Sequence, residues 1–219
     1  MLTGQTIAYA SLIGAQREYG GVRLDGCTLQ GCRLVQADDP GFSLVVRNVI
    51  LDRCRMEGRA AQGVYFEDIT VDTLHLARPH LLSGCVFRHA TLRGRIGPVM
   101  AIAPNPTSPL RPELTAGIVE KYKEVDWALD ISEAVFSDAD FCSVPGELVR
   151  RDENTQVLLR REAFGDLDRR ELPGRAGIWA SRFESTPFDS IAGIAPRGSR
   201  NFGKVMADIE WLHRQGVAG

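Results

Sequence analysis

No stretch of about 18 consecutive apolar residues occurs in this chain, so the usual pattern of a membrane-spanning helix is missing. The N-terminus also lacks a charged segment followed by an apolar run, which is the pattern of a secretory signal. We therefore expect a cytoplasmic protein that does not bind membranes. At 219 residues the chain is long enough to bury a core, either as one elongated domain or as a repeat domain with a smaller appended unit.

Residues for metal binding and catalysis are few. The four histidines show no ligand spacing such as H-E-x-x-H, and the five cysteines include no C-x-x-C pair. No sequence of the type G-x-x-x-x-G-K-[ST], G-x-G-x-x-G or G-x-S-x-G occurs. The histidines are His75, His80, His89 and His213, and the first two are predicted to point outward from different sides. We expect no catalytic residue, no metal and no cofactor.

The acidic pair Glu67 and Asp68 is the feature that most resembles a catalytic site. Paired carboxylates cleave glycosidic bonds, and such a pair could serve a carbohydrate-active enzyme built on a β-helix. Both residues, however, lie at corners of the repeat described below, where polar residues are normal. We therefore predict a non-enzymatic protein and keep a β-helical carbohydrate-active enzyme as an alternative.

Charge of neither sign dominates, because 26 Lys and Arg stand against 28 Asp and Glu. Between Leu44 and Gly97, eight arginines and five acidic residues give a net charge of about +3 (8 − 5). A protein that imitates DNA would need the opposite sign. From Glu147 to Glu171, three arginine pairs are balanced by acidic residues, whereas a nucleic-acid patch would carry one sign. We expect no direct binding to nucleic acid.

What the chain does have is a five-residue period, clearest from Leu44 to Leu81. Every fifth residue there begins a triplet whose first and third residues are apolar, and only Arg59 and Pro79 break the rule. The triplets are Leu44–Val46, Val49–Leu51, Cys54–Met56, Arg59–Ala61, Val64–Phe66, Ile69–Val71, Leu74–Leu76 and Pro79–Leu81.

This period excludes a helix as the repeating unit. Five residues advance an α-helix by about 500°, so the apolar residues would drift around its surface. In an extended backbone the outer residues of a triplet share one face, so each repeat is predicted to be a short strand followed by a corner. Glycines in pairs such as Asp25-Gly26 and Ser83-Gly84 supply the turn geometry. A chain that repeats strand and corner must coil, which predicts a β-solenoid with layers about 4.8 Å apart.

The pattern resembles that of the pentapeptide-repeat proteins, whose unit is a small residue, Asp or Asn, Leu or Phe, and two polar residues. The matches are Ala134–Asp138 and Ala139–Phe141, then Val22–Leu24, Cys27–Leu29, Cys32–Leu34, Cys85–Phe87 and Ala90–Leu92. The resemblance covers about residues 20 to 142 and implies a right-handed, quadrilateral β-helix with about four repeats per coil. The inward small position is often Val, Ile or Leu here, and the middle residue is rarely Asp.

Breaks in the period predict insertions. Residues 37–41 have the composition of a loop, and five prolines between residues 98 and 112 forbid regular strand pairing. A helix is predicted from about Pro112, and we expect it to pack across a side of the solenoid, with a partner-binding helix as the alternative. Its apolar face is formed by Leu114, Ile118, Tyr122 and Val125. The chain is thus divided into a solenoid over residues 1–145, with a loop–helix insertion at 97–127, and a C-terminal region over 146–219.

The C-terminal region lacks the period, and no element is predicted for residues 172–198. From about Arg200 to Gln215 an apolar stripe predicts a helix. The stripe consists of Phe202, Val205, Met206, Ile209 and Leu212. An open solenoid end must be covered, so this helix either caps the end or, with Trp211 as an apolar anchor, completes a homodimer.

The period also predicts which side chains meet in the interior. With a coil of about 20 residues and a one-residue slip before Cys85, Phe66 and Phe87 stack in adjacent coils, and Val46 lies on the other side of Phe66. Four inward small positions are cysteines, which we expect to be buried and reduced. They are Cys27, Cys32, Cys54 and Cys85.

A regular surface without a catalytic motif predicts a scaffold that binds another protein. The family resemblance implies a second hypothesis, because some pentapeptide-repeat proteins imitate DNA and shield a topoisomerase with strongly acidic sides. A third hypothesis is an inhibitor or immunity-type protein that neutralises a toxin, which fits a compact chain of bacterial type but has no motif of its own. The sequence does not identify the partner.

Overall fold

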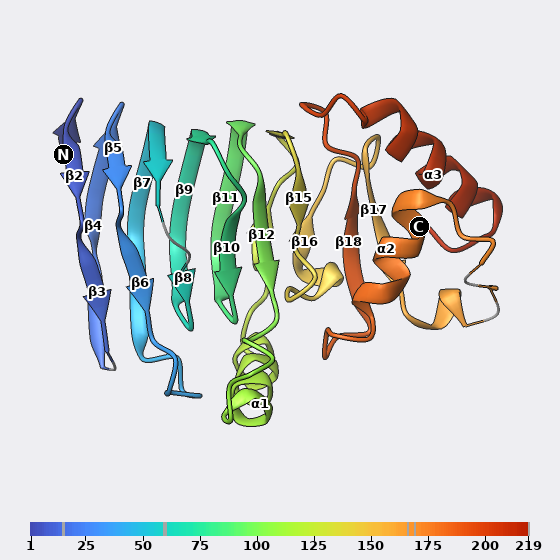
Figure 1. The fold of residues 1–219 in the computed structure, drawn as a ribbon, viewed down its shortest axis with the longest axis horizontal. Helices are drawn as coiled ribbons and strands as arrows, with labels where there is room; N and C mark the ends of the chain where they lie inside the picture. Colours follow the sequence, from blue (N-terminus) through green and yellow to red (C-terminus); the bar gives the residue numbers. More distant parts are fainter. Residues whose placement is uncertain (15, 59–60, 166, 169, 219) are drawn as a thin grey trace.

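The structure is a computed structural model that describes residues 1–14, 16–58, 61–165, 167–168 and 170–218. Its strands stack into parallel sheets in register, a β-solenoid-like arrangement, and three helices accompany them (Figure 1). The first two residues of the triplet Arg59–Ala61, and Arg169 of the third arginine pair, lie outside the described residues.

Most strands belong to two parallel sheets. In the larger sheet, the order is β1 (Leu2–Thr3), β4 (Arg17–Asp25), β7 (Leu44–Glu57), β9 (Tyr65–Leu76), β11 (Val86–Ile96), β13 (Leu129–Asp130) and β16 (Val149–Arg150), with β2 (Thr6–Ala8), β5 (Thr28–Gln30) and β14 (Ala134–Phe136) paired beside this path. In the second sheet, the order is β3 (Ser11–Ile13), β6 (Arg33–Val35), β8 (Ala61–Gln62), β10 (His80–Ser83), β12 (Val99–Ile102) and β15 (Ala139–Asp140).

The pairing register confirms the predicted interior stack. Phe66 pairs with Val46 in the coil before it and with Phe87 in the coil after it. The two phenyl rings lie 5.6 Å apart between centroids, with an interplanar angle of 13°. A five-residue period therefore placed aromatic side chains that are 21 positions apart in sequence (87 − 66) against one another.

The long strands bend at residues whose backbone has the left-handed conformation. These residues lie above one another in successive coils and form two columns. Asn48, Asp68 and His89 have φ values of 53°, 53° and 56°, and they follow residues that pair with one another in β7, β9 and β11. Asn, Asp and His are the side chains that tolerate this conformation best after glycine. The second column consists of Gly4, Gly26, Arg53, Thr73 and Gly94. Because these bends occur at equivalent positions in successive coils, each coil stacks directly on the one before it.

The register slip lies earlier than the sequence indicated, and this corrects the orientation predicted for His80. The triplet Pro79–Leu81 placed Pro79 and Leu81 inward. Instead His80 pairs with the inward Val99 and faces the interior, while Leu81 is 38% exposed. Proline has no amide N–H to donate to a sheet, so β10 begins only after Pro79, and its alternation starts from His80.

The predicted helix forms and is buried, as expected. Helix α1 (Arg111–Tyr122) buries Leu114, Ile118 and Tyr122, and the Tyr122 hydroxyl accepts a hydrogen bond of 3.2 Å from the Phe87 amide. A Cβ on Gly117 would lie 2.1 Å from the Pro40 carbonyl oxygen, so the helix packs directly on the loop of residues 37–41. Strand β12 belongs to the stack although it lies inside the range 97–127, so the insertion begins after Ile102.

The C-terminal region covers one end of the stack (Figure 1). Strands β17 (Gln156–Arg160) and β18 (Ser190–Ile194) form an antiparallel pair, next to helices α2 (Gly174–Arg182) and α3 (Phe202–Arg214) and the short 3₁₀ helices Gly146–Leu148 and Glu162–Phe164. Residues 172–198, for which no element was predicted, thus contain α2 and β18. Because β16 pairs with β13, the stacked sheet extends to Arg150, past the boundary placed at 145.

Ion pairs attach the C-terminal region to the solenoid. Arg182 Nε lies 2.7 Å from Asp140 Oδ2, and one Arg175 guanidinium nitrogen lies 3.0 Å from Asp138 Oδ1. Within this region Val205, Ile209 and Leu212 of α3 are buried in a second apolar core with α2 and β17. The apolar stripe of α3 is therefore packed inside its own chain.

Candidate functional site

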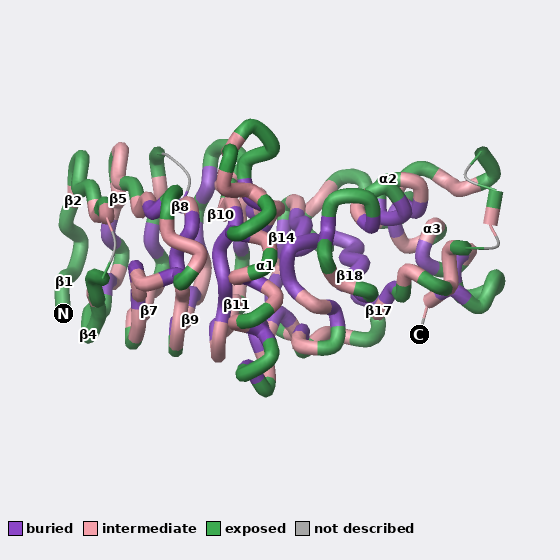
Figure 2. The backbone as a smooth tube through the Cα atoms, turned by 90° about the horizontal axis from the view of Figure 1, so that it is seen from below, coloured by how far each residue is buried: buried purple, intermediate pink, exposed green. Residues whose placement is uncertain are grey.

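At the opposite end of the stack, β1, β2 and β3 form the outermost layer among the residues that the structure describes. Each of these strands pairs on one edge only, with β4, β5 and β6 respectively. Figure 2 shows that this end is mostly exposed, whereas buried backbone predominates in the middle of the stack. Among the described residues, nothing occupies the outer edges of these strands. We call this surface, residues Met1 to Ile13 with Val22, the open end.

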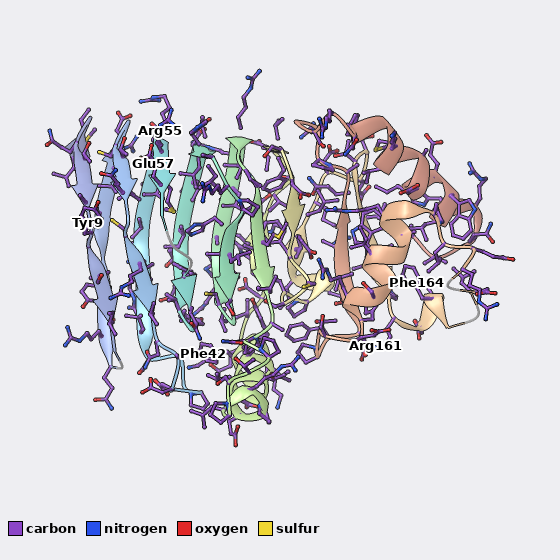
Figure 3. The ribbon with its side chains drawn as sticks, in the orientation of Figure 1. Tyr9, Phe42, Arg55, Glu57, Arg161 and Phe164 are labelled. Atoms are coloured by element: carbon purple, nitrogen blue, oxygen red, sulfur yellow. The ribbon has the colours of Figure 1, made fainter. Side chains whose placement is uncertain are left out.

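The open end exposes apolar side chains and carries no charged side chain. Residues 1–16 contain no charged side chain. Most of the large apolar side chains that are exposed lie here, namely Met1, Leu2, Tyr9, Ile13 and Val22, with only Leu81 and Ile178 elsewhere in the described part of the chain. Tyr9, at the end of the stack in Figure 3, is 76% exposed. Natural proteins usually protect exposed strand edges with charged residues or proline, and this edge has neither.

The lateral surface is different, because its charges are paired between coils. Arg47 lies 3.2 Å from Glu18 in the preceding coil and 3.3 Å from Glu67 in the next, and Glu67 also contacts Arg88 at 3.0 Å. Arg93 contacts Asp72 at 2.9 Å. Exposed pairs of this kind contribute about 0–1 kcal/mol each, but they neutralise the surface locally. The net positive charge counted from Leu44 to Gly97 therefore does not form a one-signed patch.

The candidate acidic pair belongs to the same ladders. Glu67 bridges arginines, and Asp68 contacts the Nδ1 atom of His89 at 3.2 Å. The Nε2 atom of His89 lies 2.7 Å from Asp126, and its ring stacks on Trp127 at 4.7 Å between centroids. Glu67 and Asp68 thus interact with different partners and do not face a common cavity. The other histidines are separate from this cluster: His75 is exposed on β9, and His213 Nδ1 lies 3.1 Å from the Ala218 carbonyl oxygen.

Inside the stack lies an elongated apolar cavity of about 310 Å³, which we call the lumen. Its lining extends from the open end to the layer that contains β13 and includes Ile7, Leu29, Met56, Leu76, Phe87 and Phe141. Close packing is the rule in protein interiors, and unfilled apolar volume costs about 24 cal/mol per Å³. The lumen is therefore a departure from close packing that a bound apolar group would remove.

Among the histidines, His80 lines this lumen. In the described part of the chain its imidazole has no hydrogen-bond partner. Burial among apolar groups lowers the pKa of His80, which favours the neutral ring. Because its folded-state pKa lies below the ordinary value of 6.5, protonation of His80 opposes folding as the pH falls below about 6.5.

The cysteines pack as small apolar residues. Cys27, Cys54 and Cys85 are buried and Cys32 is partly buried, and all are free thiols, as is Cys142. Burial raises the pKa of Cys85 and of Cys142 to about 12, so these thiols stay protonated at neutral pH. The thiol of Cys54 donates a weak hydrogen bond to the Leu24 carbonyl oxygen of the preceding coil.

A further hollow of about 290 Å³ lies in the C-terminal region beside Arg161 and Phe164, both labelled in Figure 3. The Arg161 guanidinium donates hydrogen bonds to the carbonyl oxygens of Phe183, Thr186 and Phe188. These bonds hold the end of α2 and the turn before β18, so Arg161 has a structural role here.

No group of three or more His, Cys, Asp or Glu side chains that could hold a metal ion was found among the described residues. In the same residues, no helix is both long and apolar enough to cross a membrane. Comparison of the chain with protein-family models, curated proteins and solved structures finds no match.

Sequence reasoning missed the two features that distinguish this molecule. A signal for the open end was present, because residues 1–16 contain apolar residues such as Leu2, Ile7 and Leu12 and no charged side chain. His80 gave no such signal, because its inward orientation follows from a slip of one residue at Pro79 that the period does not specify.

Proposed function

We propose that this chain is a non-enzymatic scaffold that binds another protein through its open end. In this proposal the stacked coils form a right-handed, quadrilateral β-helix of the pentapeptide-repeat type. The observation that carries the proposal is an apolar, uncharged strand edge at one end of a stack whose other end is covered by α2, α3 and the β17–β18 pair. Five free thiols fit a reducing compartment such as the cytoplasm.

The strand edge defines what such a partner needs. The unpaired N–H and C=O groups of β1–β3 offer backbone hydrogen bonds to an added strand, which is the binding mode called β-augmentation. The exposed side chains favour a partner whose contacting strand is apolar and uncharged. A partner with this surface gains backbone pairing and apolar burial together, so we expect the open end to dominate the affinity.

The two earlier alternatives are supported less directly. Shielding a topoisomerase by DNA imitation needs a strongly acidic side, and the lateral charges are instead paired with arginines. Neutralising a toxin remains compatible with the proposal, since the toxin would be the protein bound at the open end. A homodimer through α3 stays an untested prediction, and it would have to use side chains other than the buried Val205, Ile209 and Leu212.

The test uses two matched double variants. Tyr9→Lys with Ile13→Lys places charges at the open end, where lysine discourages strand addition. Leu81→Lys with Ile178→Lys places the same charges at the exposed apolar residues outside the open end. Proteins captured by the tagged wild-type chain in its host are identified and purified, and their affinity for each variant is measured by calorimetry. We expect the open-end variant to bind at least about 100-fold more weakly, by loss of several apolar contacts, and the control to bind normally.

Equal affinity of both variants would contradict the proposal. Thermal unfolding of each variant checks that the fold is retained. If the captured partner is a second copy of the chain, sedimentation shows a dimer that the open-end variant alone converts to monomer.

A further inference from the structure

We propose that the lumen binds one linear aliphatic chain that carries a single hydrogen-bonding head group, with the head group at His80 and the chain directed toward the open end. This inference goes beyond the binding of a partner protein, because it concerns the interior of the solenoid and a small molecule. It rests on the shape of the lumen, on its apolar lining and on the unpartnered imidazole.

The lumen is elongated along the stack. Ile7 pairs with Leu29, Leu29 with Met56, and Met56 with Leu76, and these four side chains line the lumen in successive layers about 4.8 Å apart. A second column of lining residues consists of Leu24, Leu51, Val71 and Leu92, which also pair layer by layer. The cavity is thus a narrow channel that runs along the solenoid axis through several layers. This shape suits an extended alkyl chain.

The space exists because small side chains occupy several inward positions. Ala61 lines the lumen between Leu34 and Leu82 of the neighbouring coils, and Ala90 lines it between Ile69 and Leu129. At about 310 Å³ the volume reaches the lower range of small-molecule pockets. Its lining is apolar almost throughout, so a bound group must be apolar along most of its length.

His80 is the polar anchor in the interior of the stack, whereas Arg33 lines the lumen in the second coil, where its Nε donates a hydrogen bond to Ser11 Oγ of the open end. The His80 ring is enclosed by apolar groups and lacks a protein partner among the described residues, so a hydrogen bond from a ligand is gained without breaking an existing one. A neutral imidazole donates one hydrogen bond and accepts one, so it can pair with a hydroxyl group or donate to a carboxylate oxygen. From His80 the lumen continues past Ala61 and Met56 to Ile7 and Leu12 at the open end, where the chain can enter.

The experiment measures binding of dodecanoic acid, dodecan-1-ol and dodecane to the purified full-length chain by native mass spectrometry and by competition with a fluorescent fatty acid. Ala90→Leu fills the lumen, and Thr91→Leu is its control, because Thr91 is the neighbouring residue whose side chain faces outward between Ala90 and Leu92. Ala61→Val is a second filling variant of smaller size. His80→Leu removes the anchor and keeps an apolar lining.

We expect the wild-type chain to bind all three probes with one-to-one stoichiometry and to prefer the acid and the alcohol over the alkane. Ala90→Leu and Ala61→Val should weaken binding of every probe at least about tenfold, and Thr91→Leu should not. The wild-type chain should bind the acid and the alcohol about tenfold more tightly than dodecane, which is the effect of one hydrogen bond. His80→Leu should abolish this preference and leave the affinity for dodecane unchanged.

Absence of binding to the wild-type chain, or equal binding by Ala90→Leu, Ala61→Val and wild type, would overturn the proposal. A head-group preference that survives His80→Leu would overturn the role of His80. Because these measurements use the purified chain without any partner protein, their failure would leave the binding of a protein at the open end unaffected.

Discussion

Replacing Phe66 with alanine should lower the free energy of unfolding by about 2–4 kcal/mol, less than the full cost of truncating a completely buried phenylalanine, because Phe66 is partly buried and lines the lumen. The ring stacks on Phe87 and pairs with Val46, so its loss removes contacts in three successive coils. Urea unfolding followed by circular dichroism measures the change. The control is Thr70→Ala, since Thr70 lies on the outward side of the same strand and should change stability by about 0.5 kcal/mol or less. A loss below about 1 kcal/mol for Phe66→Ala would contradict the stacked register.

Replacing Gly63 with alanine should be much more harmful than replacing Gly26, although both glycines have similar backbone angles. Their φ values are +65° and +59°, so each alanine incurs the left-handed penalty of about 1–2 kcal/mol. At Gly63, however, the new Cβ would lie 1.7 Å from the Gln36 carbonyl oxygen, whereas at Gly26 nothing lies within 4 Å.

The clash at Gly63 involves backbone of the preceding coil, which cannot rotate away as a side chain does. We therefore expect a loss of at least about 3 kcal/mol for Gly63→Ala and about 1–2 kcal/mol for Gly26→Ala. The prediction is tested by measuring the midpoint of thermal unfolding of each variant and comparing both with the wild-type chain. Equal destabilisation would show that the coils containing Gly63 and Gln36 do not approach as closely as the structure indicates.

The interior of the solenoid was predictable because a five-residue period is a local constraint repeated many times. Each triplet independently favours the inward orientation of its first and third residues. The exceptions at Arg59 and Pro79 therefore do not change the orientation predicted for the neighbouring triplets. This redundancy explains why the stack of Phe66 on Phe87 was predicted correctly. The left-handed corners at Asn48, Asp68 and His89 were harder to foresee, because the glycine pairs indicated only some of the corners.

Features that depend on one residue or on the ends of the stack were not predictable in the same way. The family resemblance begins at about residue 20, yet Leu2–Ile13 already form a layer of the stack. The antiparallel pair of β17 and β18 depends on contacts between segments about 35 residues apart in sequence, which carry no periodic signal. The volume of the lumen likewise depends on how several coils align and not on any one repeat.

The open end and the lumen are linked by geometry. Ile7 and Leu12 line the lumen and belong to the strands of the open end. A partner strand added to these strands would cover the mouth of the lumen, so a bound aliphatic chain and a bound protein are expected to influence one another. Because binding free energies are reciprocal, any effect of the ligand on partner affinity must equal the effect of the partner on ligand affinity.

The central claim is that the stack is covered at its C-terminal end and open at its N-terminal end. Hydrogen exchange of the monomeric chain, read by mass spectrometry on peptic fragments, tests it most directly. Edge strands leave about half of their amides without a partner, so peptides from Leu2–Ile13 should exchange at least about 100-fold faster than those from Tyr65–Leu76. Strands β17 and β18 also pair with one neighbour each, but Ser190–Ile194 is buried along its whole length, so we expect it to exchange more slowly than Leu2–Ile13. Equal protection of Leu2–Ile13 and Tyr65–Leu76 would contradict the account.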